Sequence, residues 1–424
     1  MRSMRFALIL VLLATPAWAE APPLSPRPAP RAEIPADRPL APTPAAAITD
    51  QARLDRWLDG YRARARDAGI DAATLNATLP GLRYLPEVIR LDRNQSEFTK
   101  TIWDYLDTAV SDLRVRNGRA AMARYAEALA RIEDRHGVPA EIVTAIWGVE
   151  SSYGAYRGNV PTLAALATLA ADSRRGAFFE EQLTEALRIV QLREVAPAAM
   201  LGSWAGAMGH TQFLPTSWRD HAQDFDGDGR RNLWGTDPRD ALESTAAYLR
   251  ANGWTPGQPW GVEVILPDGF EYRLTGERVE KTAAEWAALG VTRPGGGALP
   301  DAGPISIRVP AGHEGAAFAT YGNFRALESY NTADAYVIGV GHLADRLAGG
   351  PPLVGGWPRQ DRALSFDERI AMQEGLRAAG FDPLKIDAKI GPDTLDAIQR
   401  WQTREGLVPD GYVDVELLSR LLGG

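Results

Sequence analysis

One glutamate lies directly after a strongly apolar stretch of the sequence. Glu150 ends the apolar run 142–149, which is typical of a buried helix. Burying an unpaired carboxylate costs several kcal/mol, and an apolar setting raises a carboxyl pKa so that the group stays protonated near neutral pH. A protonated carboxyl can act as the general acid that protonates a glycosidic oxygen. The alternative is a structural glutamate capped by the Ser-Ser-Tyr run 151–153.

Glu150 has no acidic neighbour in a similarly apolar context. Most enzymes that hydrolyse glycosidic bonds use a pair of carboxyl groups. Two explanations therefore stay open. Either a second carboxylate comes from a distant part of the chain, or one carboxyl suffices because the substrate supplies its own nucleophile.

The run Asp224-Phe-Asp-Gly-Asp-Gly229 is a candidate metal site. Acidic residues at positions 1, 3 and 5 and glycine at position 6 match the start of an EF-hand loop, with the carbonyl of Arg230 at position 7. Position 12 is Gly235 rather than a bidentate glutamate, so the loop must close later, at Asp237 or Asp240. We expect this loop to bind a calcium-type ion that has a structural role. The alternative is a solvated acidic turn.

Other chemical motifs are missing from the sequence. The five histidines form no H-E-x-x-H or H-x-x-x-H pair, and there is neither a G-x-S-x-G elbow nor a P-loop. The glycine-rich segment 202–209 fits no nucleotide-binding pattern, so its glycines are expected to let the backbone approach a ligand closely. The absence of cysteine excludes disulfides, thiolate metal sites and a lipid-bearing cysteine.

Composition and the N-terminus indicate an exported protein. The 424 residues are enough for two or three domains, and the net charge of −8 with well-mixed signs argues against a nucleic-acid surface. Residues 1–19 combine a charged start, an apolar run and an Ala-Trp-Ala cleavage site, which predicts a signal peptide. The Ala/Pro-rich segment 20–49 is expected to be a disordered tether. We expect the mature protein to be soluble and periplasmic, without a membrane anchor.

The elements that must position these residues are mainly helical. Apolar periodicity predicts helices at 55–68, 119–136, 139–149, 162–171, 178–190, 240–251 and 335–347. Residues 202–236 are expected to be loops with one short helix, and short strands are expected at 262–266, 270–274 and 305–309. Residues 348–363 are predicted to be a linker, and 364–424 a separate unit of about three helices.

Several motifs carry a resemblance to a known family. They are Ile146-Trp-Gly-Val-Glu-Ser-Ser-Tyr-Gly154, Gly202-Ser-Trp-Ala-Gly-Ala-Met-Gly209 with Thr211-Gln-Phe-Leu-Pro215, the run 224–229 with Asn232-Leu-Trp234, and Tyr330-Asn331. Over residues 50–347 the sequence resembles the lytic murein transglycosylase B family, with the motifs in the same order. Residues 364–424 resemble a three-helix peptidoglycan-binding domain through Gly380-Phe, Gly391-Pro and Trp401-Gln402.

The resemblance implies both a fold and a reaction. The fold class is mainly α: a lysozyme-like helical catalytic domain with a small β insertion, plus the small three-helix C-terminal domain. The reaction is cleavage of the β-1,4 MurNAc–GlcNAc bond without water. Glu150 acts first as general acid and then as general base, while the C6 hydroxyl of the substrate attacks C1 and leaves a 1,6-anhydromuramoyl end. No cofactor is needed for this chemistry.

The resemblance also implies site residues in this sequence. The substrate groove would include Tyr105, Ser203, Gln212, Tyr248, Tyr330, Asn331 and Tyr336, with Phe178 where the family can have a tyrosine. A structural Ca²⁺ or Na⁺ would be held by Asp224, Asp226, Asp228, the carbonyl of Arg230, and Asp240, with Asp237 as the other candidate to close the loop. Well-known members are lipoproteins, whereas this chain lacks the lipid-bearing cysteine.

Two rival functions are considered beside the transglycosylase. One is a hydrolytic muramidase, which needs a carboxylate that activates water opposite Glu150. The other is a non-catalytic peptidoglycan-binding scaffold. The expected partners are peptidoglycan glycan strands, whereas cell-wall synthesis or division proteins would be unidentified partners.

Overall fold

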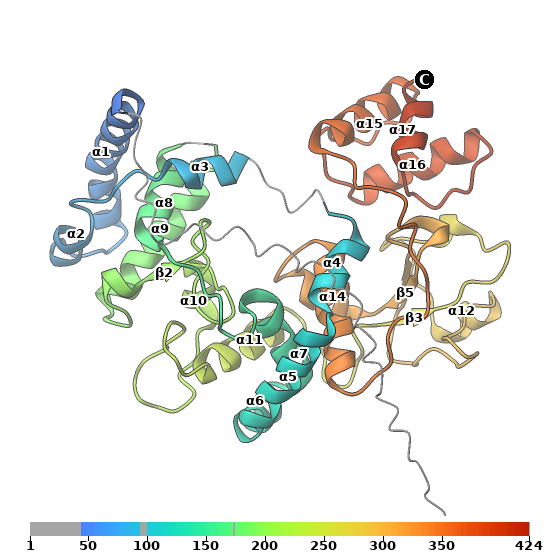
Figure 1. The fold of residues 1–424 in the computed structure, drawn as a ribbon, viewed down its shortest axis with the longest axis horizontal. Coiled ribbons are helices and arrows are strands. Elements are labelled where there is room, and N and C mark those ends of the chain that lie inside the picture. The colour runs from blue at the N-terminus through green and yellow to red at the C-terminus, as the bar shows by residue number, and fades with distance from the viewer. Residues whose placement is uncertain (1–43, 94–99, 173, 424) are drawn as a thin grey trace, which may run out of the picture. The chain divides into compact units, whose positions relative to one another are not determined.

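The computed structural model describes residues 44–93, 100–172 and 174–423, with side chains from Asp50 onward (Figure 1). The predicted signal peptide and most of the predicted tether lie outside these residues. Helix α1 (Pro44–Asp67) begins inside the segment 20–49 that the sequence predicts as a tether. Within the described residues, none of the helices is both long and apolar enough to cross a membrane.

The first group of helices packs around α8 (Thr162–Ala171). This helix is apolar on all sides, and its residues 162–170 are all buried, which explains its central place. The helices that share its core are α1, α2 (Ala72–Thr78), α3 (Pro86–Arg93), α9 (Gly176–Gln191) and α10 (Pro215–His221). The small strands β1 (Val160–Pro161) and β2 (Leu201–Gly202) pair beside α8.

The second group of helices is built around the pair α7 (Ala140–Ser151) and α14 (Asp334–Leu347), which pack against each other. Two glycines of α14 make room for aromatic rings, because a Cβ at Gly339 would lie 2.8 Å from Tyr105 and one at Gly341 would lie 2.2 Å from Trp260. The other helices of this core are α4 (Ile102–Ala109), α5 (Asp112–Arg124), α6 (Ala126–His136), α11 (Arg239–Ala251) and α13 (Gly322–Glu328).

The predicted single helix 119–136 is wrong. The structure divides it at Tyr125, which leaves the helical backbone with φ −112° and ψ 23° and caps both α5 and α6. The Tyr125 ring packs edge-on against Trp147, with 5.7 Å between the ring centroids. This long-range contact, rather than a glycine or proline, accompanies the break.

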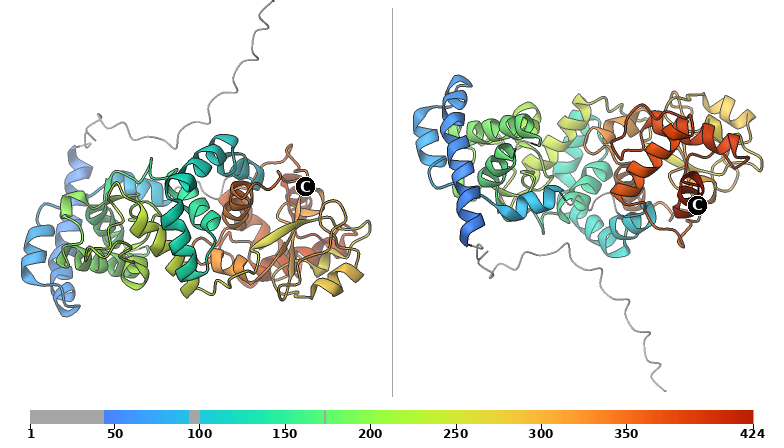
Figure 2. Two further views of the ribbon diagram at one scale, coloured as in Figure 1. Left: turned by 90° about the horizontal axis from the view of Figure 1, so that it is seen from below. Right: turned by 90° about the horizontal axis from the view of Figure 1, so that it is seen from above.

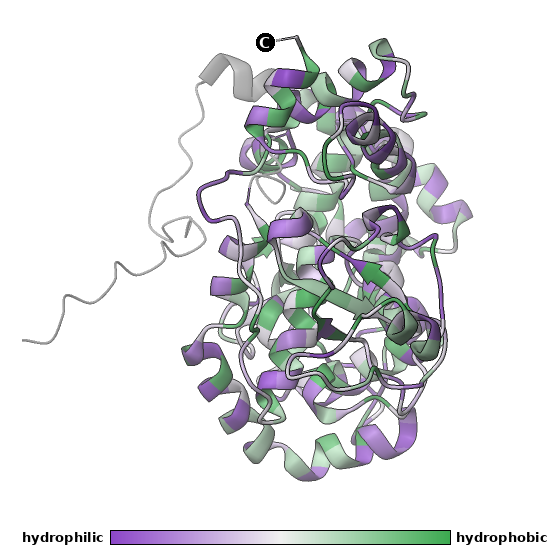
Figure 3. Cartoon of the chain, turned by 90° about the vertical axis from the view of Figure 1, so that its right-hand side faces the viewer, coloured by the Kyte–Doolittle hydropathy of each residue, from purple (hydrophilic) through white to green (hydrophobic). Residues whose placement is uncertain are grey.

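The β insertion is a three-stranded antiparallel sheet in the order β3-β5-β4, and its strands combine hydrophobic and hydrophilic residues in Figure 3. Strand β5 (Ala317–Thr320) is fully buried and lies between β3 (Gly261–Val264) and β4 (Ser306–Arg308). The predicted strand 270–274 is wrong, because residues 272–274 form a 3₁₀ turn that the Glu271 side chain caps. Helix α12 (Ala283–Ala288) begins with a capping box and contributes the fully buried Trp286.

The C-terminal unit has the three predicted helices, α15 (Phe366–Ala378), α16 (Pro392–Arg404) and α17 (Val415–Leu421), around a core that includes Trp401. It lies against the β insertion in both views of Figure 2. Asp410 accepts hydrogen bonds from the backbone amide and Nδ1 of His313, the latter at 2.6 Å. Gln399 also donates to the Thr275 hydroxyl at 3.1 Å.

The predicted linker 348–363 forms hydrogen bonds and an ion pair with residues of the preceding domain. The backbone amides of Val354 and Gly355 donate to the Glu263 carboxylate. Arg359 forms an ion pair with Asp107 at 2.8 Å. The segment therefore connects the two domains as a strap held at several points.

Candidate active site

Glu150 lies in the last turn of α7, which ends because Ser152 adopts a left-handed conformation with φ 51°. The sequence predicted a buried carboxylate without a partner, and this is wrong on both counts. Glu150 is half-buried, and the Tyr336 hydroxyl donates a hydrogen bond of 2.7 Å to its Oε1 atom. Packing of α14 against α7 brings the two residues together.

Two tyrosines share the environment of Glu150. Burial, and secondly the negative charge of Glu150, raise the pKa values of Tyr330 and Tyr336 well above that of an ordinary phenol. Their rings are nearly parallel, at 9°, with centroids 6.5 Å apart. Both phenols therefore stay protonated, and the Tyr336 hydroxyl remains a donor to the carboxylate.

A row of aromatic rings continues from Tyr330. Tyr248 packs edge-on against it with centroids 5.1 Å apart, and Phe213 contacts both rings. The Tyr330 hydroxyl donates to the Thr211 carbonyl at 2.7 Å, and the Tyr248 hydroxyl donates to the Ser329 carbonyl at 2.6 Å. The row thus has fixed ring positions, which suits a surface on which sugar rings stack.

Ser203 and Gln212 belong to the glycine-rich turn and the segment that follows it. The Ser203 hydroxyl oxygen accepts from two backbone amides of its own turn, including that of Ala207 at 3.1 Å. Gln212 has φ 54°, and its Nε2 donates to the carbonyls of Arg157 at 3.1 Å and Gly209 at 2.8 Å. These contacts fix the turn and tie it to the chain that follows α7.

The remaining predicted groove residues come from three separate segments of the chain. Tyr105 lies over Gly339, one turn beyond Tyr336 on α14. The Asn331 side chain accepts from the Ala333 amide at 3.0 Å, which shapes the turn before α14. Phe178 is 41% exposed on the first turn of α9, and its ring packs on Phe179.

Sequence reasoning missed the residues that hold the turn after Glu150. The hydroxyl of Ser151 donates to the His210 carbonyl at 2.5 Å, and Trp147 Nε1 donates to His210 Nδ1 at 3.2 Å. Tyr153 donates to the Arg114 carbonyl at 2.8 Å. Burial lowers the pKa of His210 to about 4, so the ring is neutral and can accept from Trp147.

A sequence signal for this turn exists. Residues Ser152, Tyr153 and Gly154 all have positive φ, which is costly for the two that are not glycine. A Cβ at Gly148 would lie 2.7 Å from the Tyr153 ring, so Gly148 is needed for that ring to fold back. A glycine inside a helix, followed by Ser-Ser-Tyr-Gly, could therefore have indicated a turn folded back onto its own helix.

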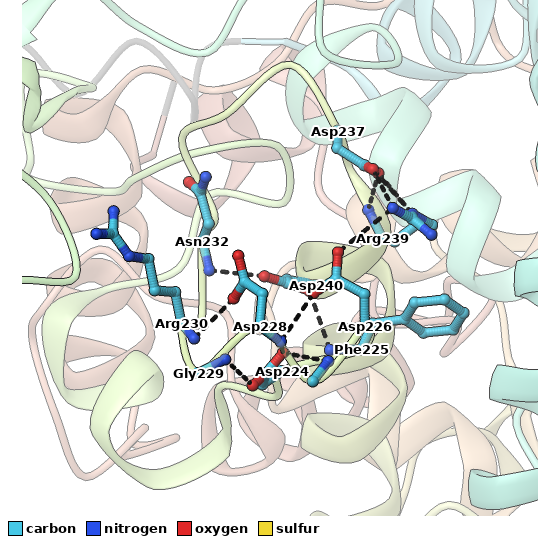
Figure 4. A network of polar contacts seen from close by, with 11 residues as sticks. Asp224, Phe225, Asp226, Asp228, Gly229, Arg230, Asn232, Asp237, Arg239 and Asp240 are labelled. Atoms are coloured by element: carbon cyan, nitrogen blue, oxygen red, sulfur yellow. Dashed lines mark hydrogen bonds and ion pairs between the residues drawn. The ribbon is translucent and has the colours of Figure 1, made fainter.

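The acidic loop converges at three carboxylates (Figure 4). One carboxylate oxygen from each of Asp224, Asp226 and Asp240 lies within 4.8 Å of the others. Asp240 accepts from the amides of Phe225 at 3.0 Å and Asn232 at 2.8 Å, so it ties both ends of the loop to the start of α11. This donor set of hard oxygens suits a calcium-type ion.

Two of the predicted ligands stand apart from this group. The Asp228 carboxylate accepts from the Arg230 amide at 2.8 Å and is not among the three converging carboxylates. Asp237 pairs with Arg239 at 2.6 Å and is not in the converging group either, whereas Asp240 is. Burial, opposed by the two amides, raises the pKa of Asp240 to about 6, and the charges of Asp226 and Asp224 add to the rise. A cation would relieve this repulsion.

Comparison with known proteins identifies the family. A family model described as the transglycosylase SLT domain matches residues 53–345, and one for a peptidoglycan binding domain matches residues 367–421. The membrane-bound lytic murein transglycosylase B of Escherichia coli (strain K12) is 33% identical over 299 residues, which cover 66% of this chain and 79% of that protein.

Solved structures agree with this result. SltB3 from Pseudomonas aeruginosa, in complex with NAG-anhNAM-pentapeptide, is similar with a TM-score of 0.84 and 46% identity, over 87% of this chain and 99% of that chain. The Escherichia coli lytic transglycosylase Slt35, in complex with calcium, is similar with a TM-score of 0.59 and 31% identity, over 70% of this chain and 93% of that one. The chain belongs to the lytic transglycosylase family, and it is an enzyme that acts on peptidoglycan. The predicted family and fold class are confirmed.

Proposed function

We propose that Glu150 is the single general acid and base of this lytic transglycosylase. The observation that carries the proposal is the 2.7 Å hydrogen bond from Tyr336, in a site where the carboxylate is half-buried at the end of an apolar helix. Such a carboxyl has a neutral donor on one side and solvent access on the other. That arrangement suits a group that gives up a proton and later takes one back.

The proton transfers balance without water. Glu150 gives its proton to the glycosidic oxygen as the bond from that oxygen to C1 of the muramoyl sugar breaks. The resulting carboxylate then accepts the proton of the C6 hydroxyl as this oxygen bonds to C1, which leaves a 1,6-anhydromuramoyl end. Tyr336 stabilises the carboxylate between the two steps, because it donates to the charged form.

We also propose a structural cation in the acidic loop, held by Asp224, Asp226 and Asp240. Two observations support it: the converging carboxylates, and the similarity of the chain to Slt35, whose structure was solved in complex with calcium. The ion would fasten the loop to α11, which carries Tyr248, and would take no part in the proton transfers. For location, the sequence of residues 1–19 supports export by a cleaved signal peptide and a soluble periplasmic enzyme.

The test is Glu150→Gln, which keeps the size of the side chain and removes the transferable proton. We expect the rate of peptidoglycan cleavage to fall at least about 10²–10⁴-fold, the range for loss of general acid–base catalysis. The matched control is Glu141→Gln in the first turn of the same helix, which should retain full activity. Near-normal turnover by Glu150→Gln would refute the assignment.

Mass spectrometry of the wild-type digest separates the rival functions. Anhydromuramoyl ends identify the transglycosylase. Reducing ends would instead indicate a hydrolytic muramidase, and binding to the wall without soluble fragments would indicate a non-catalytic scaffold.

A further inference from the structure

A hollow of about 390 Å³ opens beside the turn that follows Glu150. Its walls come from the ends of α5 and α7 and from the loops that follow α7 and precede α11. Three aromatic rings and three nitrogen-bearing side chains dominate the lining: Tyr125, Trp147, Tyr153, Arg124, Arg157 and His210. We call this hollow the arginine pocket.

The arginine pocket is cationic although the whole chain is acidic. Neither an aspartate nor a glutamate is among its lining residues, whereas the chain carries a net charge of −8. The Arg124 guanidinium lies 5.3 Å from the centre of the Tyr125 ring. Arg157 Nη1 donates to the Gly235 carbonyl, which anchors this guanidinium at the wall. Two guanidinium groups over an aromatic floor fit a ligand with a carboxylate on an aliphatic body.

The arginine pocket and the catalytic site share the same short segment of chain. Trp147 and Glu150 lie one turn apart on α7, so the helix presents one to the pocket and the other to the reaction. The Arg157 carbonyl accepts from Gln212, and a Cβ at Gly158 would lie 2.7 Å from the Ser203 amide. A substrate that contacts Ser203 and Gln212 therefore passes close to the pocket.

We propose that the arginine pocket binds a carboxylate of the stem peptide that branches from the muramoyl residue next to the cleaved bond. This inference rests on the proposed function. The stem leaves the glycan at the lactyl group of the muramoyl sugar, a few bonds from the reacting C1 atom. It is a short peptide that carries carboxylates and aliphatic side chains, so it presents the two properties that the pocket complements. The enzyme then distinguishes glycan with stem peptides from glycan without them.

The kinetic test compares Arg124→Gln on two substrates, soluble glycan strands that carry stem peptides and the same strands after amidase treatment. Arg124 is suited because it is exposed at the end of α5 and its Gln variant keeps most of the length of the side chain. We expect kcat/KM to fall about three- to tenfold on the peptide-bearing strands and to stay unchanged on the stripped strands. Arg116→Gln, an exposed arginine of the same helix outside the pocket, is the control and should affect neither substrate.

Three outcomes would overturn the inference: no loss, an equal loss on both substrates, or a loss confined to stripped strands, whose lactyl groups then carry free carboxylates. A binding measurement does not depend on catalysis. Wild-type and Glu150→Gln protein should both bind the free stem pentapeptide, with quenching of tryptophan fluorescence, and Arg124→Gln should bind it at least threefold more weakly. The same peptide with amidated carboxylates should bind no better to wild type than to Arg124→Gln. If the pentapeptide does not bind, the pocket assignment fails even where the role of Glu150 holds.

Discussion

At the residue scale, the proposed chemistry depends on the contact between Glu150 and Tyr336. The Tyr336 phenol is buried and stays neutral. It therefore donates a hydrogen bond to the carboxylate without placing a second negative charge beside it. The other two tyrosines of the row donate to backbone carbonyls. Their hydroxyl groups therefore hold the rings in place, whereas the Tyr336 hydroxyl would take part in the proposed proton transfer.

Tyr336→Phe should therefore lower kcat about 10- to 100-fold, because a hydrogen bond to a charged group contributes about 1.5–3 kcal/mol. The comparison is Tyr248→Phe, which removes a hydroxyl that donates to Ser329 and leaves Glu150 with its partner. We expect this second variant to retain most of its kcat. Equal losses in the two variants, measured by release of soluble fragments, would contradict a specific role for Tyr336.

The sequence predicted which residue types form this site better than how they contact one another. Glu150 stands out because its surroundings are apolar, and the aromatic residues follow from the family motifs. Its partner lies 186 positions away, and no local pattern relates α7 to α14. The positive φ of Gln212 and the neutral His210 likewise follow from tertiary contacts, which periodicity does not encode.

At the element scale, helices that are buried on all sides were the easiest to predict. The apolar run of α8 was predicted with its observed bounds, since ten consecutive apolar or small residues leave few alternatives. The break at Tyr125 and the 3₁₀ turn at 272–274 were missed, because ring packing and a side-chain cap decide them. Local propensity is a weak guide at such positions.

Helix α14 contains a histidine that should make stability depend on pH. Burial and the nearby Arg346 lower the pKa of His342 to about 4, whereas an unfolded chain titrates near 6.5. The unfolded state therefore binds more protons between these values, and the stability present above pH 6.5 is lost as pH falls toward 4. At about 1.4 kcal/mol per pKa unit, the loss at pH 4.5 is about 2–3 kcal/mol.

Urea unfolding at pH 7.5 and pH 4.5 tests this expectation with His342→Gln, which cannot be protonated. The variant should lose less stability than the wild type between the two pH values. Because both proteins share the same carboxylates, acid effects at other positions cancel in the comparison. An identical pH dependence would mean that His342 is not responsible.

Calcium should stabilise the folded protein, because an ion bound in the acidic loop would link that loop to α11. In metal-stripped protein, Ca²⁺ at 100 times its Kd should raise the free energy of unfolding by about 2.7 kcal/mol. Asp240→Asn should remove most of the increase in Tm, whereas Asp237→Asn should retain it because Asp237 pairs with Arg239. The reverse ranking in thermal melts with Ca²⁺ and with chelator would assign the closing ligand to Asp237.

At the scale of the whole molecule, the C-terminal unit is joined to the β insertion by more than a flexible connection. Asp410 is buried and accepts two hydrogen bonds from His313, and Arg278 pairs with Asp393. The strap 348–363 also contributes to the catalytic domain, since Trp357 packs near Trp103 with centroids 6.3 Å apart. A truncation should therefore keep the strap and remove residues 364–423 and the final glycine.

That truncation should weaken pull-down by insoluble peptidoglycan and slow the digestion of whole sacculi. Tethering a wall-binding module raises the local concentration of the catalytic site at its substrate without a new contact at the reacting bond. Cleavage of short soluble glycans should change less than about twofold, because Glu150 and its partners lie in the other domain. Loss of soluble-substrate cleavage with intact wall binding would show that this division of labour is wrong.

Main-chain contact between Gly158 and Gly202 has a consequence for how such an enzyme can diverge. A Cβ at Gly158 would lie 2.1 Å from the Gly202 carbonyl, and one at Gly202 would lie 2.2 Å from the Ala207 carbonyl. The spacing between the chain after α7 and the glycine-rich turn is thus set by backbone atoms alone. Substitutions of the surrounding side chains can alter which sugars and substituents are preferred. They cannot change this spacing gradually, because backbone atoms set it. Only the loss of a glycine would do so, and it would force the two segments apart at once.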